Sequence, residues 1–192
     1  MQAFRNHTPK RRNITTKVSH YREHLNELKI DYNNRCGYCG DFYTWRISWF
    51  EIDHFVPQKH LVTISPEDYS NLVFACRSCN NAKRAKWPTG SETQHNINDE
   101  GFIDPCDDEY NNQFSRFDDG RIKAETKLGE WIYRELRFYK PQHEIIWNIE
   151  QLAILIEECK SLLESTNNEN IKDRLLKLYD EYFNYTKQLG DC

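Results

Sequence analysis

The sequence predicts an α+β fold, and three observations lead to this class. Two C-x-x-C pairs are separated by 36 residues. In the segment between them, side chains suited to the two faces of a strand first alternate and an apolar run then follows, which is the pattern of two short strands. Stripes of large apolar side chains at helical spacing fill the last third of the chain. We therefore expect a small zinc-stapled strand–strand–helix core followed by a mainly helical C-terminal region.

Composition divides the chain into three parts. Residues 1–14 are polar and basic and are expected to form a flexible arm, with or without a partner. Residues 15–90 would form the core domain with an N-terminal helix, and residues 91–192 an acidic, mainly helical region. Residues 1–90 carry 14 Lys and Arg against 8 Asp and Glu, whereas residues 91–192 carry 12 against 22. A nucleic acid would therefore prefer the first half, and the second half suits contact with protein, unless both are simply solvated surfaces.

Composition also bears on the class of protein. No run of 18 apolar residues is present, so the sequence predicts no membrane-spanning helix, and the N-terminus lacks the apolar region of a secretory signal. Four of the seven cysteines form the two C-x-x-C pairs, which indicates metal binding in a reducing compartment, with the cytoplasm as the expected location. Cys106, Cys159 and Cys192 receive no role.

The expected elements follow one another along the chain. A helix is predicted over residues 15–32, capped by Thr15 or Thr16. Residues 88–100 are polar and unpatterned, as in a loop. Further on, the sequence predicts a turn at 118–120, a short helix at 128–136 that ends before Pro141, and an antiparallel pair of helices at 149–163 and 171–183. The apolar stripes of that pair are either core or a partner surface.

The two cysteine pairs are Cys36 with Cys39 and Cys76 with Cys79. Two such pairs complete a tetrahedral thiolate site for Zn²⁺, with Zn–S distances of roughly 2.3 Å, and a closed shell of this kind is structural. A disulfide or a redox dithiol are the alternatives. Both are unfavourable in a reducing compartment that holds two matched pairs.

Between the pairs, residues 47–54 alternate as a strand and end in Asp53 and His54. A second strand is predicted at 72–75, and a helix from Cys76 to Lys86 follows it. Asp53 can bind a hard cation such as Mg²⁺ or Mn²⁺, and Asn80 can offer a second oxygen ligand. His54 can take a proton from water near neutral pH, as a general base does.

The remaining polar residues of this segment have auxiliary roles in the hypothesis. Asn71 can orient His54 through an amide hydrogen bond, and Lys83 can reach a phosphate oxygen. The expected nucleic-acid contacts are Arg77, Lys83, Arg84 and Lys86. Each residue alone has an ordinary explanation, as a turn residue, a solvated strand end or a basic helix face. Their joint order within the zinc frame favours a functional site.

These residues resemble the HNH endonucleases, whose core is the ββα-metal motif. The matching pattern is Cys36-x-x-Cys39, Asp53-His54-x-x-Pro57, Asn71-Leu72 and Cys76-x-x-Cys79-Asn80-x-x-Lys83, within residues 30–87. The resemblance implies that His54 is the general base, that Asp53 and Asn80 bind the catalytic cation, and that Asn71 orders the loop. Asn80 stands where the family often has His.

A looser resemblance lies downstream, in Phe102–Pro105, Phe114 and Asp119–Ile122. It is to the HNH proteins of Septu and retron-type anti-phage systems, and it implies an ATPase partner. The sequence thus predicts a metal-dependent endonuclease acting on nucleic acid, preferentially DNA, and the looser resemblance implies control by that partner in an anti-phage system. The competing hypothesis is a zinc-ribbon module that binds nucleic acid or protein without catalysis.

Overall fold

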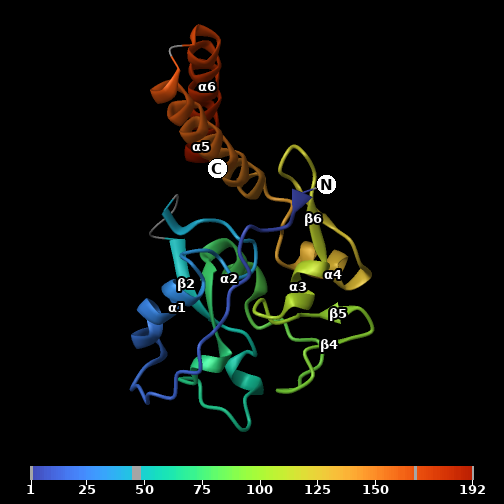
Figure 1. Cartoon of the computed structure of the whole chain (residues 1–192). Coiled ribbons are helices and arrows are strands. Elements are labelled where there is room, and N and C mark those ends of the chain that lie inside the picture. The colour runs from blue at the N-terminus through green and yellow to red at the C-terminus, as the bar shows by residue number, and fades with distance from the viewer. Residues whose placement is uncertain (1, 45–48, 167, 192) are drawn as a thin grey trace. The chain divides into compact units, whose positions relative to one another are not determined.

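The computed structural model describes residues 2–44, 49–166 and 168–191, which form two compact units (Figure 1). The first unit comprises residues 1–117 and 122–139, and the second comprises residues 118–121 and 140–192. Strands and helices occur together in the first unit, whereas the second is built from two long helices. The predicted α+β class with a helical C-terminal region is confirmed.

A strand–strand–helix unit lies at the centre of the first unit. Strands β2 (Phe50–His54) and β3 (Leu72–Cys76) pair antiparallel, with Phe50 opposite Cys76 and His54 opposite Leu72. All five residues of β3 are buried, as expected of an uninterrupted apolar strand. Helix α2 (Arg77–Lys83) follows directly. The predicted order of elements is confirmed, while Ile47 and Ser48 of the predicted first strand lie outside the described residues.

Helix α2 is shorter than expected because the backbone turns at Arg84, whose φ is 49°. Its start is fixed by Cys76, the N-cap residue, whose sulfur accepts a hydrogen bond from the Cys79 N–H. The α2 backbone therefore begins at the cysteine pair itself.

The N-terminal helix is also shorter than the expected range of 15–32. It consists of a 3₁₀ turn, η1 (Tyr21–His24), and helix α1 (Leu25–Asp31). His20, and neither Thr15 nor Thr16, caps it in a capping box with Glu23. The preceding segment is tied to the end of α1, because the Lys10 and Arg12 N–H groups donate to the backbone and the carboxylate of Asp31.

Residues 2–14, the described part of the predicted basic arm at 1–14, do not form a free arm. Strand β1 (Gln2–Ala3) pairs with β6 (Phe114–Arg116), which pairs in turn with β7 (Ile122–Ala124). Phe4 follows β1 and is only 3% exposed within the core of the unit. One aromatic residue and a short β pairing therefore anchor a segment whose composition is otherwise that of a solvated terminus.

The first unit extends past residue 90 because residues as far as Phe138 share its core. The predicted loop at 88–100 contains part of a small hairpin. The remaining elements of this unit are η3 (Gln58–His60), η4 (Tyr69–Asn71), β4 (Asn96–Ile97), β5 (Glu100–Gly101), α3 (Asp108–Asn112) and α4 (Lys127–Glu135). The turn between β6 and β7 contains Gly120, whose φ of 90° suits glycine.

The second unit is a helical hairpin of α5 (Pro141–Ser165) and α6 (Glu169–Asp191). Helix α5 begins earlier than predicted because Pro141 occupies its first turn, a position that proline favours. The two helices share a small apolar core made by Leu152, Ile156, Cys159 and Leu178. No helix among the described residues has the length and apolar character needed to cross a membrane.

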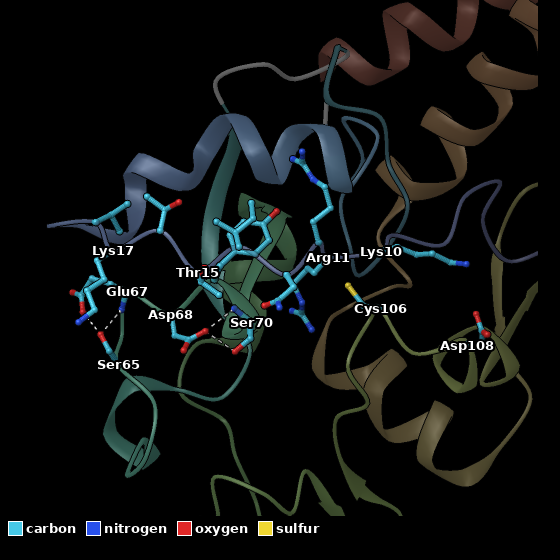
Figure 2. Close-up of a pocket in the computed structure, with 16 residues that line it drawn as sticks. Lys10, Arg11, Thr15, Lys17, Ser65, Glu67, Asp68, Ser70, Cys106 and Asp108 are labelled. Atoms are coloured by element: carbon cyan, nitrogen blue, oxygen red, sulfur yellow. Dashed lines mark hydrogen bonds between the residues drawn. The ribbon is translucent and has the colours of Figure 1, made fainter.

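A pocket of about 1090 Å³ lies on the first unit between the segment 10–18 and the loop 65–70 (Figure 2). The segment contributes basic residues, among them Lys10 and Lys17, and the loop contributes Glu67 and Asp68. The opposite walls of the pocket therefore differ in charge.

Candidate metal centre and active site

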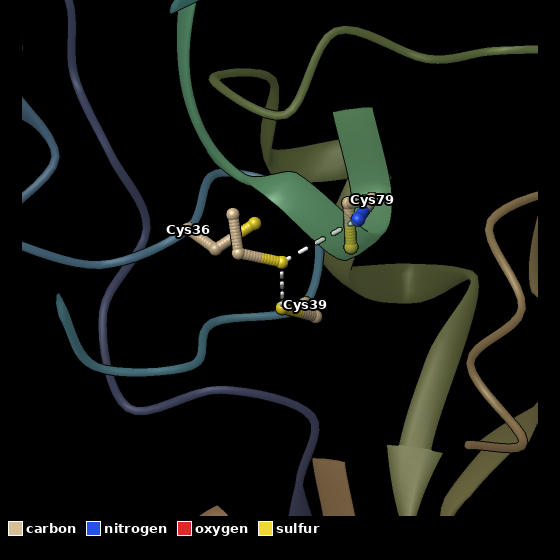
Figure 3. Close-up of side chains that lie close together, drawn as sticks. Cys36, Cys39 and Cys79 are labelled. Carbon is tan, nitrogen blue, oxygen red and sulfur yellow. Dashed lines mark hydrogen bonds between the residues drawn. The ribbon is translucent and has the colours of Figure 1, made fainter. Parts of the chain in front are cut away.

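Two chain segments distant in sequence bring four thiols together (Figure 3). Cys36 and Cys39 lie on a turn, Cys76 ends β3, and Cys79 lies in the first turn of α2. All four are buried, and their sulfur atoms all lie within 4.8 Å of one another. The Cys39 and Cys76 sulfurs are 3.8 Å apart. A tetrahedral ion with Zn–S bonds of roughly 2.3 Å requires an S···S edge of about 3.8 Å.

The turn that carries the first pair is tightly built. The Gly40 N–H donates to the Cys36 carbonyl, and Gly40 has a φ of 79°, which glycine adopts without strain. The Gly37 N–H donates to the Phe74 carbonyl, which fastens the turn to β3. A Cβ at Gly37 would lie 2.6 Å from the Tyr32 ring. Both glycines are therefore required by the close approach of the backbone.

The surroundings of the thiols favour a bound cation. Burial raises the pKa of the Cys39 and Cys79 thiols well above their usual value, whereas in Cys36 burial is outweighed by hydrogen bonds from the other thiols, which lower the pKa. The cluster thus favours one thiolate, and ionising the other thiols without a counter-charge is unfavourable. A soft divalent cation stabilises the thiolate form, and a closed set of four thiolates is a typical structural zinc site. The donor set fits zinc.

His54 ends β2 with its ring in a defined orientation. The ring Nε2 lies 2.8 Å from the Pro66 carbonyl oxygen and 3.2 Å from the Gln58 amide nitrogen. The Pro66 carbonyl can only accept, so this shorter contact requires the tautomer that carries its proton on Nε2 and leaves Nδ1 as the proton acceptor. In that tautomer the Gln58 amide nitrogen, itself a donor, forms no hydrogen bond with the ring. The Tyr21 ring packs edge-on against the imidazole at a centroid distance of 4.7 Å. The group has the geometry of an oriented base.

Asn71 orders the loop that follows His54, but through a different contact from the expected one. Its side-chain oxygen accepts from the Val56 N–H at 2.8 Å, and its amide nitrogen donates to the Val56 carbonyl at 2.9 Å. The Phe55 N–H also donates to the Asn71 carbonyl. The expected bond to the imidazole is thus replaced by a backbone pair, because the Asn71 side chain is buried beside the loop.

Lys83 does not lie where the sequence predicted it. Its side chain is fully buried, and its ammonium lies 2.9 Å from the Asp53 carboxylate and 2.8 Å from the His54 carbonyl oxygen. The Tyr38 hydroxyl donates to the same Asp53 oxygen at 2.5 Å. Burial, followed by the nearby Asp53, raises the pKa of Tyr38 well above its usual value, which keeps this donor protonated. The expected phosphate contact by Lys83 is therefore wrong, because α2 packs this side chain against β2.

Asp53 therefore binds both the Lys83 ammonium and the Tyr38 hydroxyl, and it is only 7% exposed. A different carboxylate, Glu51, faces the open side of the site. It accepts from the Asn80 amide at 2.7 Å and from the Arg77 guanidinium at 2.8 Å. Sequence reasoning missed Glu51. Its position two residues before Asp53 on a strand was the available signal, since alternate residues share a face.

A pocket of about 470 Å³ opens beside Glu51 and Asn80. Its other lining residues come from η1, α1 and β2; they are Tyr21, Arg22, Leu25, Phe50 and Ile52. Because Tyr21 also packs against His54, the pocket and the imidazole share one wall. The site therefore extends beyond the two strands and α2 to the N-terminal helix.

The basic residues expected to contact nucleic acid differ in whether a carboxylate of the protein already binds them. Arg84 is exposed, whereas Arg77 is bound to Glu51 and Lys86 forms an ion pair with Glu135 at 2.8 Å. Arg77 and Lys86 keep half or somewhat less of their side-chain surface exposed. The basic face of α2 is thus partly neutralised by carboxylates of its own unit.

Comparison with known proteins adds one finding. Residues 36–86 match the family model of the HNH endonuclease. A search of curated proteins and a search of solved structures gave no match. The resemblance to anti-phage HNH proteins and the ATPase partner therefore stay predictions. The matched segment spans both cysteine pairs, Asp53–His54, Asn71 and Asn80, and residues 36–86 are therefore similar to the HNH endonuclease.

Proposed function

We propose that the protein is a metal-dependent endonuclease that hydrolyses phosphodiester bonds of nucleic acid, preferentially DNA, with His54 as the general base. The observation that carries this proposal is the oriented imidazole of His54, held through Nε2 by the Pro66 carbonyl inside a segment that matches the HNH endonuclease. The buried thiols and the net positive charge of residues 1–90 agree with a cytoplasmic enzyme that approaches phosphates.

In the proposed reaction, Nδ1 of His54 takes a proton from a water molecule. The water oxygen forms a bond to phosphorus, the bond to the 3′ oxygen breaks, and the leaving oxygen takes a proton from solvent. The Pro66 carbonyl favours the imidazolium that forms, because it accepts from the opposite ring nitrogen. Asn71 keeps the adjoining loop in place through Val56.

Two kinds of metal belong to this proposal. Zn²⁺ would be held by Cys36, Cys39, Cys76 and Cys79 and would join β3 and α2 to the turn that carries the first pair. For Mg²⁺ or Mn²⁺, the oxygens of Glu51 and Asn80 fit better than the expected set of Asp53 and Asn80. Asp53 is buried in its ion pair with Lys83, whereas Glu51 lines the open pocket and its ion pair with Arg77 is partly solvated. When bound, such a cation would stabilise negative charge on the scissile phosphate.

Two surfaces would contact the rest of the substrate. Arg22 lines the smaller pocket beside Glu51 and Asn80, where it can approach a phosphate next to the scissile bond. Lys10 and Lys17 line the larger pocket beside the loop that contains Pro66, and they can follow the flanking backbone (Figure 2).

The test is cleavage of supercoiled plasmid DNA, with and without Mg²⁺ or Mn²⁺. We expect wild-type protein to nick the plasmid only with the metal and to lose activity in EDTA. His54→Ala should reduce the rate at least about a hundredfold while retaining zinc and fold. His7→Ala, which removes a histidine outside the site, should cut at the wild-type rate. Undiminished cleavage by His54→Ala would falsify the assignment.

The alternative of a zinc-dependent binding module predicts a different result. Wild-type protein would then retain DNA in a gel-shift experiment, yet cut neither DNA nor RNA with any divalent cation. A role in anti-phage defence and an ATPase partner are separate predictions from the loose downstream resemblance, and this assay does not depend on them.

A further inference from the structure

Residues 36–86, which match the HNH endonuclease, are called the HNH segment below. Two arginines outside this segment are buried against its first cysteine pair, Cys36 and Cys39. Arg5, just after β1, is 7% exposed. It donates to the Gly37 carbonyl, to the Pro105 carbonyl at 2.6 Å and to the Asn111 side-chain oxygen at 2.6 Å. Its aliphatic stem also packs on Gly40. The guanidinium therefore reaches into the turn that carries Cys36 and Cys39.

Arg116, in β6, is 1% exposed and approaches the same turn. It donates to the Phe4 carbonyl at 2.8 Å and to the Cys39 carbonyl at 3.3 Å. Each arginine thus binds one backbone carbonyl of the turn that carries the first pair. The two side chains come from neighbouring parts of the chain, since Arg5 follows β1 closely and β1 pairs with β6, which contains Arg116.

The surroundings of Arg5 lack a negative charge that would compensate the charge of its guanidinium. Its hydrogen-bond acceptors are all neutral oxygens, and within the described residues no carboxylate forms an ion pair with it. Burial lowers the pKa of Arg5, while Tyr110, Cys106 and Cys36 are the groups whose charge would oppose that shift. Arg11 offers a contrast, since it is also largely buried but is paired with Asp104. A buried cation without a counter-ion is strongly unfavourable.

The thiol cluster can supply that counter-charge. One divalent zinc ion and four thiolates leave two negative charges in the buried site. We propose that Arg5 and Arg116 are the counter-charges of this cluster, so that zinc retention depends on two residues outside the HNH segment. The inference rests on the zinc part of the proposed function and is independent of cleavage.

The test is the rate at which zinc passes from the intact protein to an excess of the chromogenic chelator 4-(2-pyridylazo)resorcinol at neutral pH. Arg5→Met keeps an unbranched, flexible stem and removes the charged guanidinium, and it should release zinc about tenfold faster or more. Arg5→Lys keeps the charge and should stay closer to the wild-type rate. Arg11→Met is the matched control, because it removes a buried arginine whose partner is Asp104.

The outcomes separate charge from packing. The proposal is overturned if Arg5→Met and Arg5→Lys release zinc equally fast, or if Arg11→Met accelerates release as much as Arg5→Met. If Arg5→Met does not fold, the same comparison is made with Arg116→Met and Arg116→Lys, where a slower release by the lysine variant supports the proposal. Zinc-free wild-type protein overturns both the zinc site and the counter-charges, whereas the cleavage assay reports separately on His54.

Discussion

At the scale of single residues, the buried pair of Lys83 and Asp53 joins α2 to β2 at the end of the strand that carries His54. The Lys83 ammonium bonds both the Asp53 carboxylate and the His54 carbonyl, and no part of its side chain is exposed. Removing one partner of a buried ion pair leaves the other charge uncompensated, which typically costs about 3–5 kcal/mol.

We therefore expect Lys83→Met to lower the free energy of unfolding by about 3–5 kcal/mol, measured by urea denaturation. Lys86→Met is the control, because the Lys86–Glu135 pair is partly solvated and should contribute less than about 1 kcal/mol. Equal, small losses in both variants would contradict the structural role of Lys83 and would return it to the list of phosphate contacts.

A second residue-scale prediction compares the two carboxylates of β2. Glu51→Gln should raise the Mg²⁺ concentration needed for half-maximal cleavage at least about tenfold, with little change in stability. Asp53→Asn should lower stability because Lys83 then loses its buried partner. Cleavage titrations with Mg²⁺ and unfolding curves of both variants decide the matter. A stable Asp53→Asn variant that no longer responds to Mg²⁺ would restore Asp53 as the ligand.

At the scale of elements, the loop between η3 and η4 holds His54 in place and is itself held by Glu92. The Val62, Thr63 and Ile64 N–H groups all donate to this carboxylate at 3.0–3.1 Å. These backbone bonds, with the Thr63 hydroxyl, lower the pKa of Glu92 to about 2. The carboxylate therefore stabilises the loop fully above its usual pKa near 4.5 and loses this effect as the pH falls towards 2.

Glu92→Gln should loosen this loop at neutral pH, and its effect should stay constant from pH 7 to pH 5 because Glu92 remains ionised there. Amide hydrogen exchange, corrected for intrinsic rates, should show reduced protection at residues 62–64. The plasmid-nicking rate should fall moderately, since Pro66 belongs to the same loop. Unchanged protection in Glu92→Gln would show that other contacts order the loop.

At the scale of the whole molecule, the chain divides near residue 139 rather than at residue 90. The core that contains the cysteine pairs also contains Phe102, Phe114 and Phe138. The helical hairpin has its own core, and Ile154, Leu176 and Phe183 are at least half exposed on it. The protein contact predicted for this region stays a prediction, and these exposed apolar groups are where it would form.

Two truncations test this division. A chain ending at residue 139 should fold, bind one zinc ion and cut DNA, because it keeps every residue of the HNH segment and its core. A chain ending at residue 100 should fail to retain zinc, because it lacks Arg116 and the three aromatic residues named above. Circular dichroism, elemental analysis and plasmid nicking provide the readouts. Full zinc retention by the shorter chain would place the boundary near residue 90 after all.

The sequence by itself determined the parts that depend on short-range spacing. The two C-x-x-C pairs predicted the thiol cluster, the alternation before Asp53 and His54 predicted β2, and the apolar run before Cys76 predicted β3. These signals are local, since a strand alternates with a period of two and two cysteines three positions apart can face one ion.

Only the tertiary structure decided which polar groups are buried and with what. Lys83 has the local pattern of an exposed basic helix face, yet α2 packs it against Asp53. Arg5 has the pattern of a solvated terminus, yet pairing of β1 with β6 carries it to the cysteine turn. Burial of a charge depends on partners that can lie as far as 112 residues away, as Phe4 does from Arg116, and the spacing of neighbouring residues does not reveal such partners.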